Sequence, residues 1–261
     1  GSRWSGGTRG QSGACGVSLR LFCVAGCADA HMMLRALYLL MLLTSPVWAL
    51  EPPHKVQMDF AVTSGSMSLG KGRDILEHDG KRYSVISESK TVGIAACFYK
   101  MNIRRESQGL VTKAGLRPLH FEEERTRKPK RAADFNWDAK QITLTDGDNV
   151  STVALPDNTY DQTSFAYAFA FRSPEDELPP VHLTDGRKLS DYKYQKVGTE
   201  KIKTPIGELN TVHFRKVLEG DDKRGFEVWL AVDQHYLPVQ IRFIEKDGTV
   251  LDSTVTALSY Q

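Results

Sequence analysis

Asp-Gly dipeptides between β-type segments are the feature that most limits what this chain can fold into. Each is flanked by strand-like residues, and this combination is the strongest short-range signal for a β-hairpin. The four dipeptides are Asp79-Gly80, Asp146-Gly147, Asp185-Gly186 and Asp247-Gly248. Strands do not alternate with long helical patterns, so they are expected to pair antiparallel. The sequence predicts a mostly β fold, a single large curved antiparallel sheet or open barrel of about ten to twelve strands with one or two short helices.

Two hairpins can be assigned directly from the pattern. Ile142-Thr143-Leu144 is expected to pair with Val150–Leu155, and Phe226–Val232 with Pro238–Ile244. The second pair is joined by Asp233-Gln234-His235, a polar connection of the length that hairpins use.

Two segments have helical character. Gly93–Met101 contains a continuous apolar cluster, and Asp161–Phe171 alternates aromatic residues with alanines. The period of two favours a strand over Asp161–Phe171, whereas the alanine content favours a helix. We favour the helix, because Asp161 and Ser164 are suited to act as structural caps that satisfy the free N–H groups of its first turn.

A secretory signal peptide is predicted at Met32–Ala49. Arg35 supplies the positive start, an apolar run too short to span a bilayer follows, and Pro46 ends that run. Val47 and Ala49 fit the small-residue cleavage pattern, so cleavage is expected after Ala49. The alternative is a membrane anchor or a buried helix. Export predicts a periplasmic location for residues 50–261, which we expect to form a single β domain.

The residues upstream of the signal peptide, 1–31, are rich in Gly, Ser and Arg without apolar periodicity. We interpret them as an unstructured or mis-started extension. Val24-Ala25-Gly26-Cys27 resembles a lipobox, which would make Cys27 a lipid anchor. We do not favour that anchor, because the apolar stretch before it is short and follows Arg20.

Charge and cysteine content bear on two possibilities, nucleic-acid binding and an internal disulfide. Residues 1–49 hold four Arg and one Asp, so 30 of the 34 basic and 31 of the 32 acidic residues remain in the predicted mature chain. This near-neutral balance gives no support to nucleic acid as a partner. Of the four cysteines, only Cys97 follows the signal peptide, so an internal disulfide is excluded there. Free cysteines usually pack as small hydrophobes, and Cys97 is expected to be a buried structural thiol.

Recognised catalytic and metal-binding motifs are missing from the sequence. The histidines are scattered without the spacing of a two-ligand metal face, and Asp161, Ser164 and a distant His form only a weak candidate triad. We therefore predict no catalytic residues, no metal and no cofactor. Glu122-Glu123-Glu124 is interpreted as a solvated strand, because alternation keeps its carboxylates from facing one site. Arg125–Arg131 is interpreted as a solvated hairpin tip, with contact to anionic lipid headgroups as the alternative.

Aromatic residues on β-type segments are the positive signal. A curved sheet can present them on one concave face, either as a packed core or as the lining of an apolar cavity. The residues we select as candidate ligand-binding residues are Phe98, Trp137, Tyr160, Phe165, Tyr167, Phe169 and Trp229.

A family resemblance rests on a series of short motifs. In chain order they are Gly115-Leu116-Arg117-Pro118, Phe135-Asn136-Trp137, Asp161–Phe165, Thr184–Arg187, Thr204–Gly207, Glu227–Ala231 and Tyr236–Val239. Their order and spacing resemble the bacterial exported family catalogued as domain of unknown function 3108. The resemblance covers about Val56–Ser259 and implies a periplasmic or envelope protein, with no known reaction. Asn136 stands where the family usually has Asp, which argues against catalysis there.

The closing tryptophan hairpin also resembles lipoprotein-carrier folds, in which an open barrel holds acyl chains. From these resemblances we expect a non-enzymatic envelope protein that binds a lipid or acyl chain, or a lipoprotein tail, in the concave face. The alternative is a structural or protein-interaction module with a solid core and an envelope protein as partner. A hydrolase acting through Asp161 or Ser164 is the third hypothesis.

Overall fold

The computed structural model describes residues 52–172, 174 and 178–261. The predicted extension at 1–31, with Cys27, and the predicted signal peptide at 32–49 lie outside the described residues. Within the described residues, no helix is both long and apolar enough to cross a membrane.

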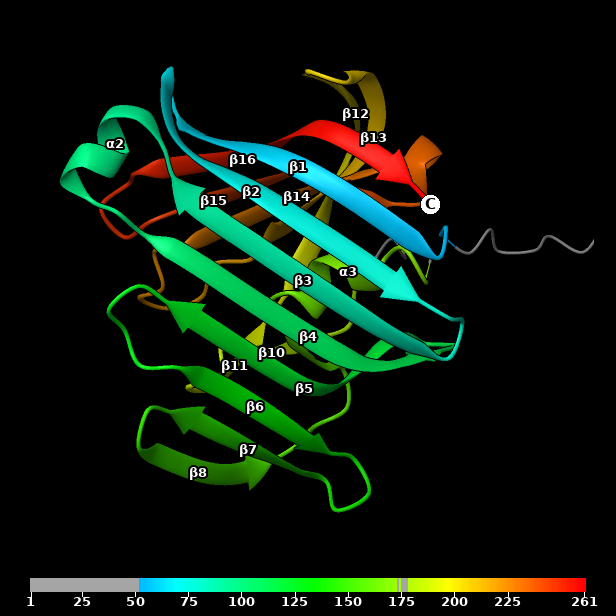
Figure 1. The fold of residues 1–261 in the computed structure, drawn as a ribbon. Coiled ribbons are helices and arrows are strands. Elements are labelled where there is room, and N and C mark those ends of the chain that lie inside the picture. Colours follow the sequence, from blue (N-terminus) through cyan, green and yellow to red (C-terminus); the bar gives the residue numbers. More distant parts are fainter. Residues whose placement is uncertain (1–51, 173, 175–177) are drawn as a thin grey trace, which may run out of the picture. The chain divides into compact units, whose positions relative to one another are not determined.

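One large antiparallel sheet of thirteen strands dominates the described residues (Figure 1). Its order is β12-β13-β14-β15-β16-β1-β2-β3-β4-β5-β6-β7-β8, so β12 and β8 form its two edges. The strands of one half are β1 (Lys55–Ser64), β2 (Met67–His78), β3 (Arg82–Thr91), β4 (Asn102–Thr112), β5 (Gly115–Arg125), β6 (Arg131–Asn136), β7 (Gln141–Asp146) and β8 (Asn149–Ala154). Those of the other half are β12 (Tyr194–Thr204), β13 (Gly207–Lys216), β14 (Gly225–Ala231), β15 (Leu237–Ile244) and β16 (Val250–Tyr260). The predicted fold class is confirmed, with slightly more strands than expected.

A second sheet of three strands has the order β11-β10-β9. It consists of β9 (Thr159–Asp161), β10 (Val181–Thr184) and β11 (Leu189–Tyr192). β9 and β10 run parallel, which differs from the expectation of antiparallel pairing throughout. The connection between them contains a helix and so can bring the chain back in the same direction.

All four Asp-Gly dipeptides lie where one strand turns back beside the next. They join β2 to β3, β7 to β8, β10 to β11 and β15 to β16. Gly186 shows why glycine is needed: its φ is +82°, and a Cβ there would lie 2.9 Å from the Arg131 Cβ. The two predicted hairpins are also found, as β7 with β8 and as β14 with β15. A short 3-10 helix, η1 (Val232–Gln234), connects the latter pair.

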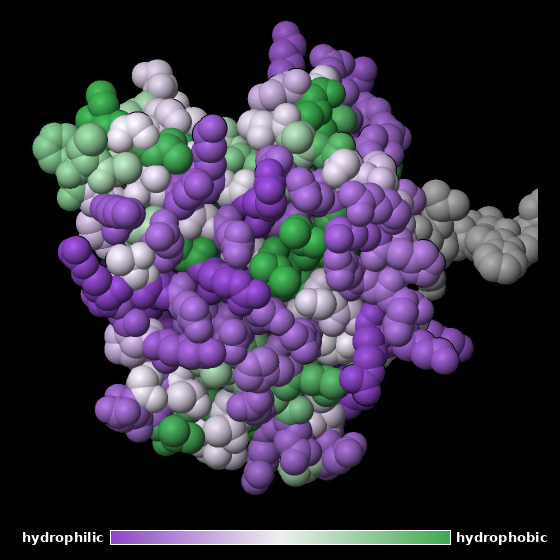
Figure 2. All heavy atoms as spheres, viewed as in Figure 1, coloured by the Kyte–Doolittle hydropathy of each residue, from purple (hydrophilic) through white to green (hydrophobic). Residues whose placement is uncertain are grey.

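The first predicted helix is α2 (Gly93–Phe98), between β3 and β4. None of its residues is buried, and hydrophobic side chains gather over it in Figure 2. The expectation that Cys97 is a buried thiol is wrong, since Cys97 is exposed. The reason is that α2 lies in the connection between β3 and β4, where none of the described residues forms a second layer over it.

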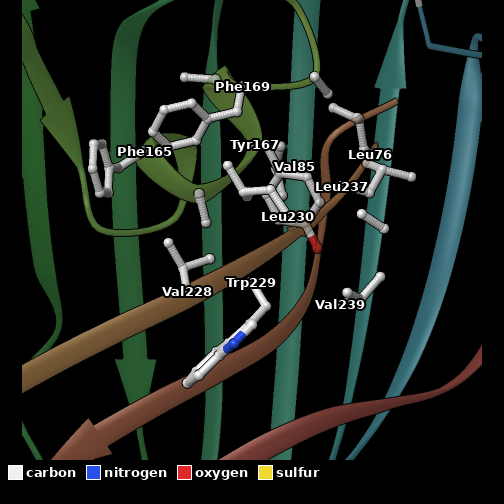
Figure 3. Close-up of a cluster of buried hydrophobic side chains, with 14 of the residues drawn as sticks. Leu76, Val85, Phe165, Tyr167, Phe169, Val228, Trp229, Leu230, Leu237 and Val239 are labelled. Atoms are coloured by element: carbon white, nitrogen blue, oxygen red, sulfur yellow. The ribbon is translucent and has the colours of Figure 1, made fainter. Parts of the chain in front are cut away.

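The second predicted helix is α3 (Ser164–Ala168), and all five of its residues are buried. It contacts strands from both halves of the large sheet, β5 and β15, so the sheet curves around it. Figure 3 shows Phe165, Tyr167 and Phe169 of this segment beside Val228, Leu230 and Leu237 of the sheet. A helix that is apolar on every side is stable only when other elements surround it. Such a helix has no polar face, so the pattern of apolar residues alone could not distinguish a helix from a strand here.

Candidate functional site

The seven candidate ligand-binding residues fall into separate environments. Tyr160, Phe165, Tyr167, Phe169 and Trp229 belong to the main core cluster. Trp137 packs against a second cluster under β5 to β8, and its indole N–H donates to the Pro118 carbonyl at 2.7 Å. Phe98 is 86% exposed on α2. The structure therefore brings five of the seven into one cluster and leaves Trp137 and Phe98 outside it.

Within the core cluster, the indole of Trp229 points away from Phe165 and Phe169 (Figure 3). It stacks on His213, with ring centroids 4.0 Å apart, and its N–H donates to Glu200 at 2.7 Å. Trp229 thus packs on the side of β14 that faces away from α3.

The concave face of the sheet is filled by the chain itself. The cavity beside α3, lined by Tyr160, Phe165 and Phe169 among others, has a volume of about 10 Å³. Ligand sites usually measure about 300–1,000 Å³. Among the described residues, the side chains beside α3 are therefore packed closely, and this cavity is too small for an acyl chain.

Asp161 and Ser164 form a buried polar network at the start of α3. The Asp161 carboxylate accepts the backbone N–H groups of Thr163 and Ser164 at 2.9 and 2.8 Å. It also accepts the hydroxyls of Ser164 and Ser107 at 2.7 and 2.6 Å. Since Ser107 gives its proton to Asp161, the Tyr83 hydroxyl donates to Ser107 at 3.0 Å.

Burial dominates the electrostatics of this network. It raises the pKa of Asp161 above the ordinary value, although the hydrogen bonds oppose that shift. Burial, with the neighbouring Asp161 charge, also raises the pKa of Tyr83. Asp161 and Ser164 are fully buried, and their hydrogen bonds hold the turn that begins α3.

Glu123 is the polar residue that the sequence interpretation placed wrongly. Its neighbours Glu122 and Glu124 do point to solvent, but Glu123 is only 2% exposed and lies on the concave side. Around it gather Arg105 of β4, Arg125 at the end of β5 and Arg131 of β6, at 2.7, 2.9 and 3.7 Å. A buried carboxylate needs such partners because its charge is otherwise unsolvated.

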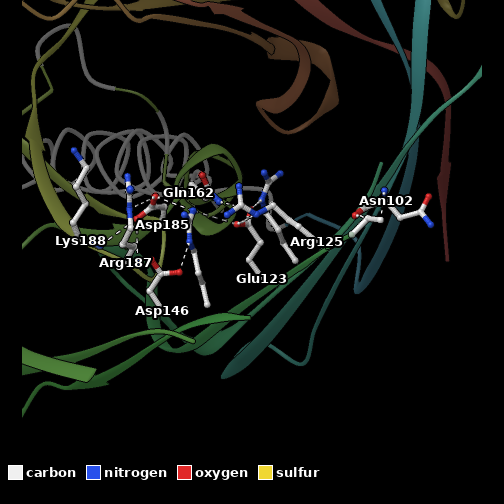
Figure 4. Close-up of polar contacts among 11 residues, drawn as sticks. Asn102, Glu123, Arg125, Asp146, Gln162, Asp185, Arg187 and Lys188 are labelled. Carbon is white, nitrogen blue, oxygen red and sulfur yellow. Dashed lines mark hydrogen bonds and ion pairs between the residues drawn. The ribbon is translucent and has the colours of Figure 1, made fainter. Parts of the chain in front are cut away.

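The Glu123 cluster ties three parts of the fold together (Figure 4). Gln162, which follows β9, donates to Glu123 at 3.1 Å. Arg131 also pairs with Asp146 of β7 and with Asp185 in the β10–β11 turn, at 3.1 and 3.3 Å. Arg125 and Arg131 thus turn inward, and only the residues between them form the solvated hairpin tip that was expected.

An open groove of about 570 Å³ lies at the end of the large sheet near the β2–β3 and β4–β5 turns. The residues that line it are mostly of polar or charged types and include His54, His78, Arg82, Tyr83, Gln108 and His120. The His78 Nδ1 accepts the Gly80 N–H, so its Nε2 must donate to the Pro52 carbonyl. His120 is paired with Asp134 at 2.7 Å. These groups are held by the fold's own contacts and show no pairing of a nucleophile with a base.

Comparison with protein families gives one match. The family described as "Protein of unknown function (DUF3108)" matches residues 59–256. The chain belongs to the DUF3108 family. This match confirms the resemblance drawn from the short motifs. None of the curated proteins matches the chain.

Three solved structures similar to this DUF3108 protein are distant from it in sequence. A β-barrel-like protein of the DUF1849 family from Brucella abortus has a TM-score of 0.52 at 8% identity, covering 81% of this chain and 99% of the other. The MucA/MucB complex of Pseudomonas aeruginosa reaches 0.31 at 13% identity, covering 78% and 51%. A putative outer membrane lipoprotein-sorting protein domain from Vibrio parahaemolyticus reaches 0.22 at 8%, covering 79% and 85%. The first similarity supports a shared barrel-like fold, and the other two scores are too low to do so.

The two edges of the DUF3108 sheet differ in chemistry. β12 carries Glu200 and three lysines, and its pairing with β13 shifts register between Lys196 and Gly198. Charges and bulges are the usual protection of an edge strand against further pairing. β8 has no charged residue, no proline and no register shift, and all six of its residues are exposed. β12 therefore carries the usual protection of an edge strand, and β8 does not.

The second core cluster ends at this open edge. Val153 of β8 pairs with Ile142, and Ser151 pairs with Leu144. Ile142 and Leu144 are buried in the cluster, whereas Val153 remains 40% exposed. Side chains at these paired positions share a face of the sheet, so an apolar residue on an added strand would extend the cluster beyond Val153.

Proposed function

We propose that this protein is a non-catalytic interaction module of the bacterial cell envelope, with a solid core. The closely packed side chains beside α3 support an interaction module rather than a ligand carrier, because the cavity there has a volume of only about 10 Å³. The burial of Asp161 and Ser164 argues against a hydrolase built on them. The predicted signal peptide at Met32–Ala49 supports export to the periplasm.

The bare edge strand β8 is the observation that carries this proposal. Its partner is an extended segment of another envelope protein, which adds a strand beside β8 through main-chain hydrogen bonds. Apolar side chains at alternate positions of that segment pack against Val153 and the second core cluster. The contrast with the charged and bulged β12 supports β8 as the binding edge.

Site-specific photo-crosslinking in the host tests the proposal. A photoreactive residue replaces Val150 on β8 in one full-length variant and Val197 on β12 in a matched control, since both side chains are exposed. We expect a crosslinked protein from position 150 and none from 197. Adding Val153→Lys, which gives β8 the protection that β12 has, is expected to abolish the crosslink while the protein remains folded. Equal crosslinking at both edges, or a crosslink that survives Val153→Lys, would rule out strand addition at β8.

A hydrophobic ligand is the second candidate. The observation in its favour is that Tyr160, Phe165 and Phe169 form an aromatic cluster around a helix of only five residues. A lipid could occupy their place only if α3 left the concave face. Mass spectrometry of protein purified from its host, together with uptake of a fluorescent fatty acid, tests this. Bound lipid would favour the carrier; until then the seven aromatic residues stay a prediction.

A further inference from the structure

The connection between β3 and β4 forms an exposed apolar tip. Ile94, Phe98 and Tyr99 of this connection are 77%, 86% and 61% exposed, and Met67 at the start of β2 is 62% exposed. The backbone of Val92 hydrogen-bonds to Leu69, which fixes the helix beside β2. Figure 2 shows hydrophobic side chains gathered over α2, and other hydrophobic patches between polar side chains on the same face. Exposed apolar side chains concentrated in one place indicate a contact surface.

This end of the sheet has cations and no acidic residues in three neighbouring stretches. Residues 60–73, 89–105 and 125–133 contain no Asp or Glu. The third stretch is tied to the tip, because Thr126 donates its backbone N–H to the Asn102 carbonyl. Five exposed cations here have no ion pair with any residue that the structure describes: Lys71, Lys90, Lys100, Arg127 and Lys128.

Two of these cations face each other across neighbouring strands. Lys71 of β2 pairs directly with Lys90 of β3. Asp74 and Leu76 of β2 point inward, so alternation places Lys71, and Lys90 with it, on the outer face. Like charges directly opposite each other destabilise a sheet, and an anion bound between them would remove that repulsion.

We propose that α2 and the cations around it form a docking tip for an anionic lipid bilayer. Ile94 and Phe98 enter the interfacial layer, Tyr99 lies at the headgroup level, and Lys71, Lys90 and Lys100 contact lipid phosphates. Apolar side chains beside a cluster of lysines are the pattern of interfacial membrane binding. An acidic protein would match the charge alone, whereas a bilayer matches both the charge and the protruding apolar side chains. The proposal is independent of strand addition at β8.

Cys97 provides a reporter, because it lies inside the tip and is exposed. The full-length chain, with Cys15, Cys23 and Cys27 changed to Ser, carries an environment-sensitive dye on Cys97. Vesicles of phosphatidylglycerol are expected to shift the dye emission to the blue, and spin-labelled lipids within them to quench it. Phosphatidylcholine vesicles are expected to do neither. Because the signal comes from position 97, binding through the predicted signal peptide does not produce it.

Matched variants separate the contributions of charge and apolar contact. Lys71→Glu with Lys90→Glu is expected to lower partitioning into anionic vesicles about ten-fold or more, since each cation near such a surface contributes measurably. Lys81→Glu with Lys113→Glu makes the same charge change at the opposite end of the sheet and is expected to have a much smaller effect. Ile94→Ser with Phe98→Ser, read from the same dye on Cys97, is expected to abolish the blue shift.

Three results would overturn the proposal. The first is an unshifted dye on anionic vesicles, and the second is equal losses from the two lysine pairs. The third is an acidic protein partner that protects Cys97 while vesicles do not.

Discussion

The phenolic hydroxyl of Tyr167 on α3 donates a hydrogen bond of 2.6 Å to the carboxylate of Asp74 on β2. The two residues are 93 positions apart in the sequence. Burial raises the pKa of Asp74, although Tyr167 and Ser87 oppose the shift by hydrogen bonding. Burial, and then the Asp74 charge, raise the pKa of Tyr167. This contact anchors the helix that fills the core to the inner face of the sheet.

Tyr167→Phe is expected to destabilise the protein by about 1–3 kcal/mol, because it removes one hydrogen-bond donor from a largely desolvated carboxylate. Urea unfolding measures the change. Adding Asp74→Leu removes the carboxylate that has lost this donor. The double variant is therefore expected to lose less free energy of unfolding than the sum of the losses in the two single variants. Additive losses would show that the two side chains are not coupled.

Glu123→Gln is expected to destabilise the protein by about 2–3 kcal/mol, because three arginines lose their shared anion. The partial exposure of those arginines keeps the value below that of a fully buried pair. Glu124→Gln, one position along the same strand and 58% exposed at its side chain, is the matched control. It is expected to change stability by no more than about 0.5 kcal/mol. Equal effects in urea unfolding would contradict the buried position of Glu123.

Asp74 also predicts a pH dependence. Its pKa in the folded protein is raised above the ordinary value of 3.8. Between these two values the folded state holds more protons than the unfolded chain, so its stability falls as the pH rises through that window. Asp74→Asn removes this titration and can still accept from Tyr167. The stability of the variant relative to the wild type should therefore increase as the pH rises from 3.8 through the folded pKa. A difference that stays constant across the series would show that burial does not perturb this carboxyl.

The Asp-Gly turns offer a matched pair of glycines. Gly186 and Gly248 have almost the same φ, +82° and +85°. A Cβ at Gly248 would meet nothing within 4 Å, whereas at Gly186 it would meet Arg131 and the Ala132 backbone at 2.9 and 3.0 Å. Gly248→Ala is expected to cost about 1–2 kcal/mol for the left-handed backbone alone. Gly186→Ala should cost clearly more, and equal melting temperatures would show that the close approach relaxes freely.

Local signals made much of the fold predictable. The Asp-Gly dipeptides, together with the β-type residues beside them, indicated the hairpins, because a two-residue turn and its strands are set by neighbouring residues. Both helices were also indicated by short apolar runs. The parallel pairing of β9 with β10 was not predictable in this way, since it depends on how the chain returns after α3.

The buried polar contacts could not be predicted from local sequence. Glu123 has the composition of a solvated strand around it, and only the fold brings Arg105, Arg131 and Gln162 to its carboxylate. The exposure of Cys97 and Phe98 was missed for the opposite reason. Their apolar run resembles a core segment, and the pattern contains no information on whether a second layer covers it. Alternation did carry one usable signal at Glu123, because the middle of three consecutive strand residues must face the other side.

The asymmetry of the sheet edges limits the size of any assembly formed through them. If a second copy of the chain pairs along β8, the outer edge of the joined sheet is β12 on both sides. β12 carries charges and a bulge, which oppose further growth. Self-association through β8 therefore stops at two copies. The protein can expose an unprotected edge strand without polymerising into fibres.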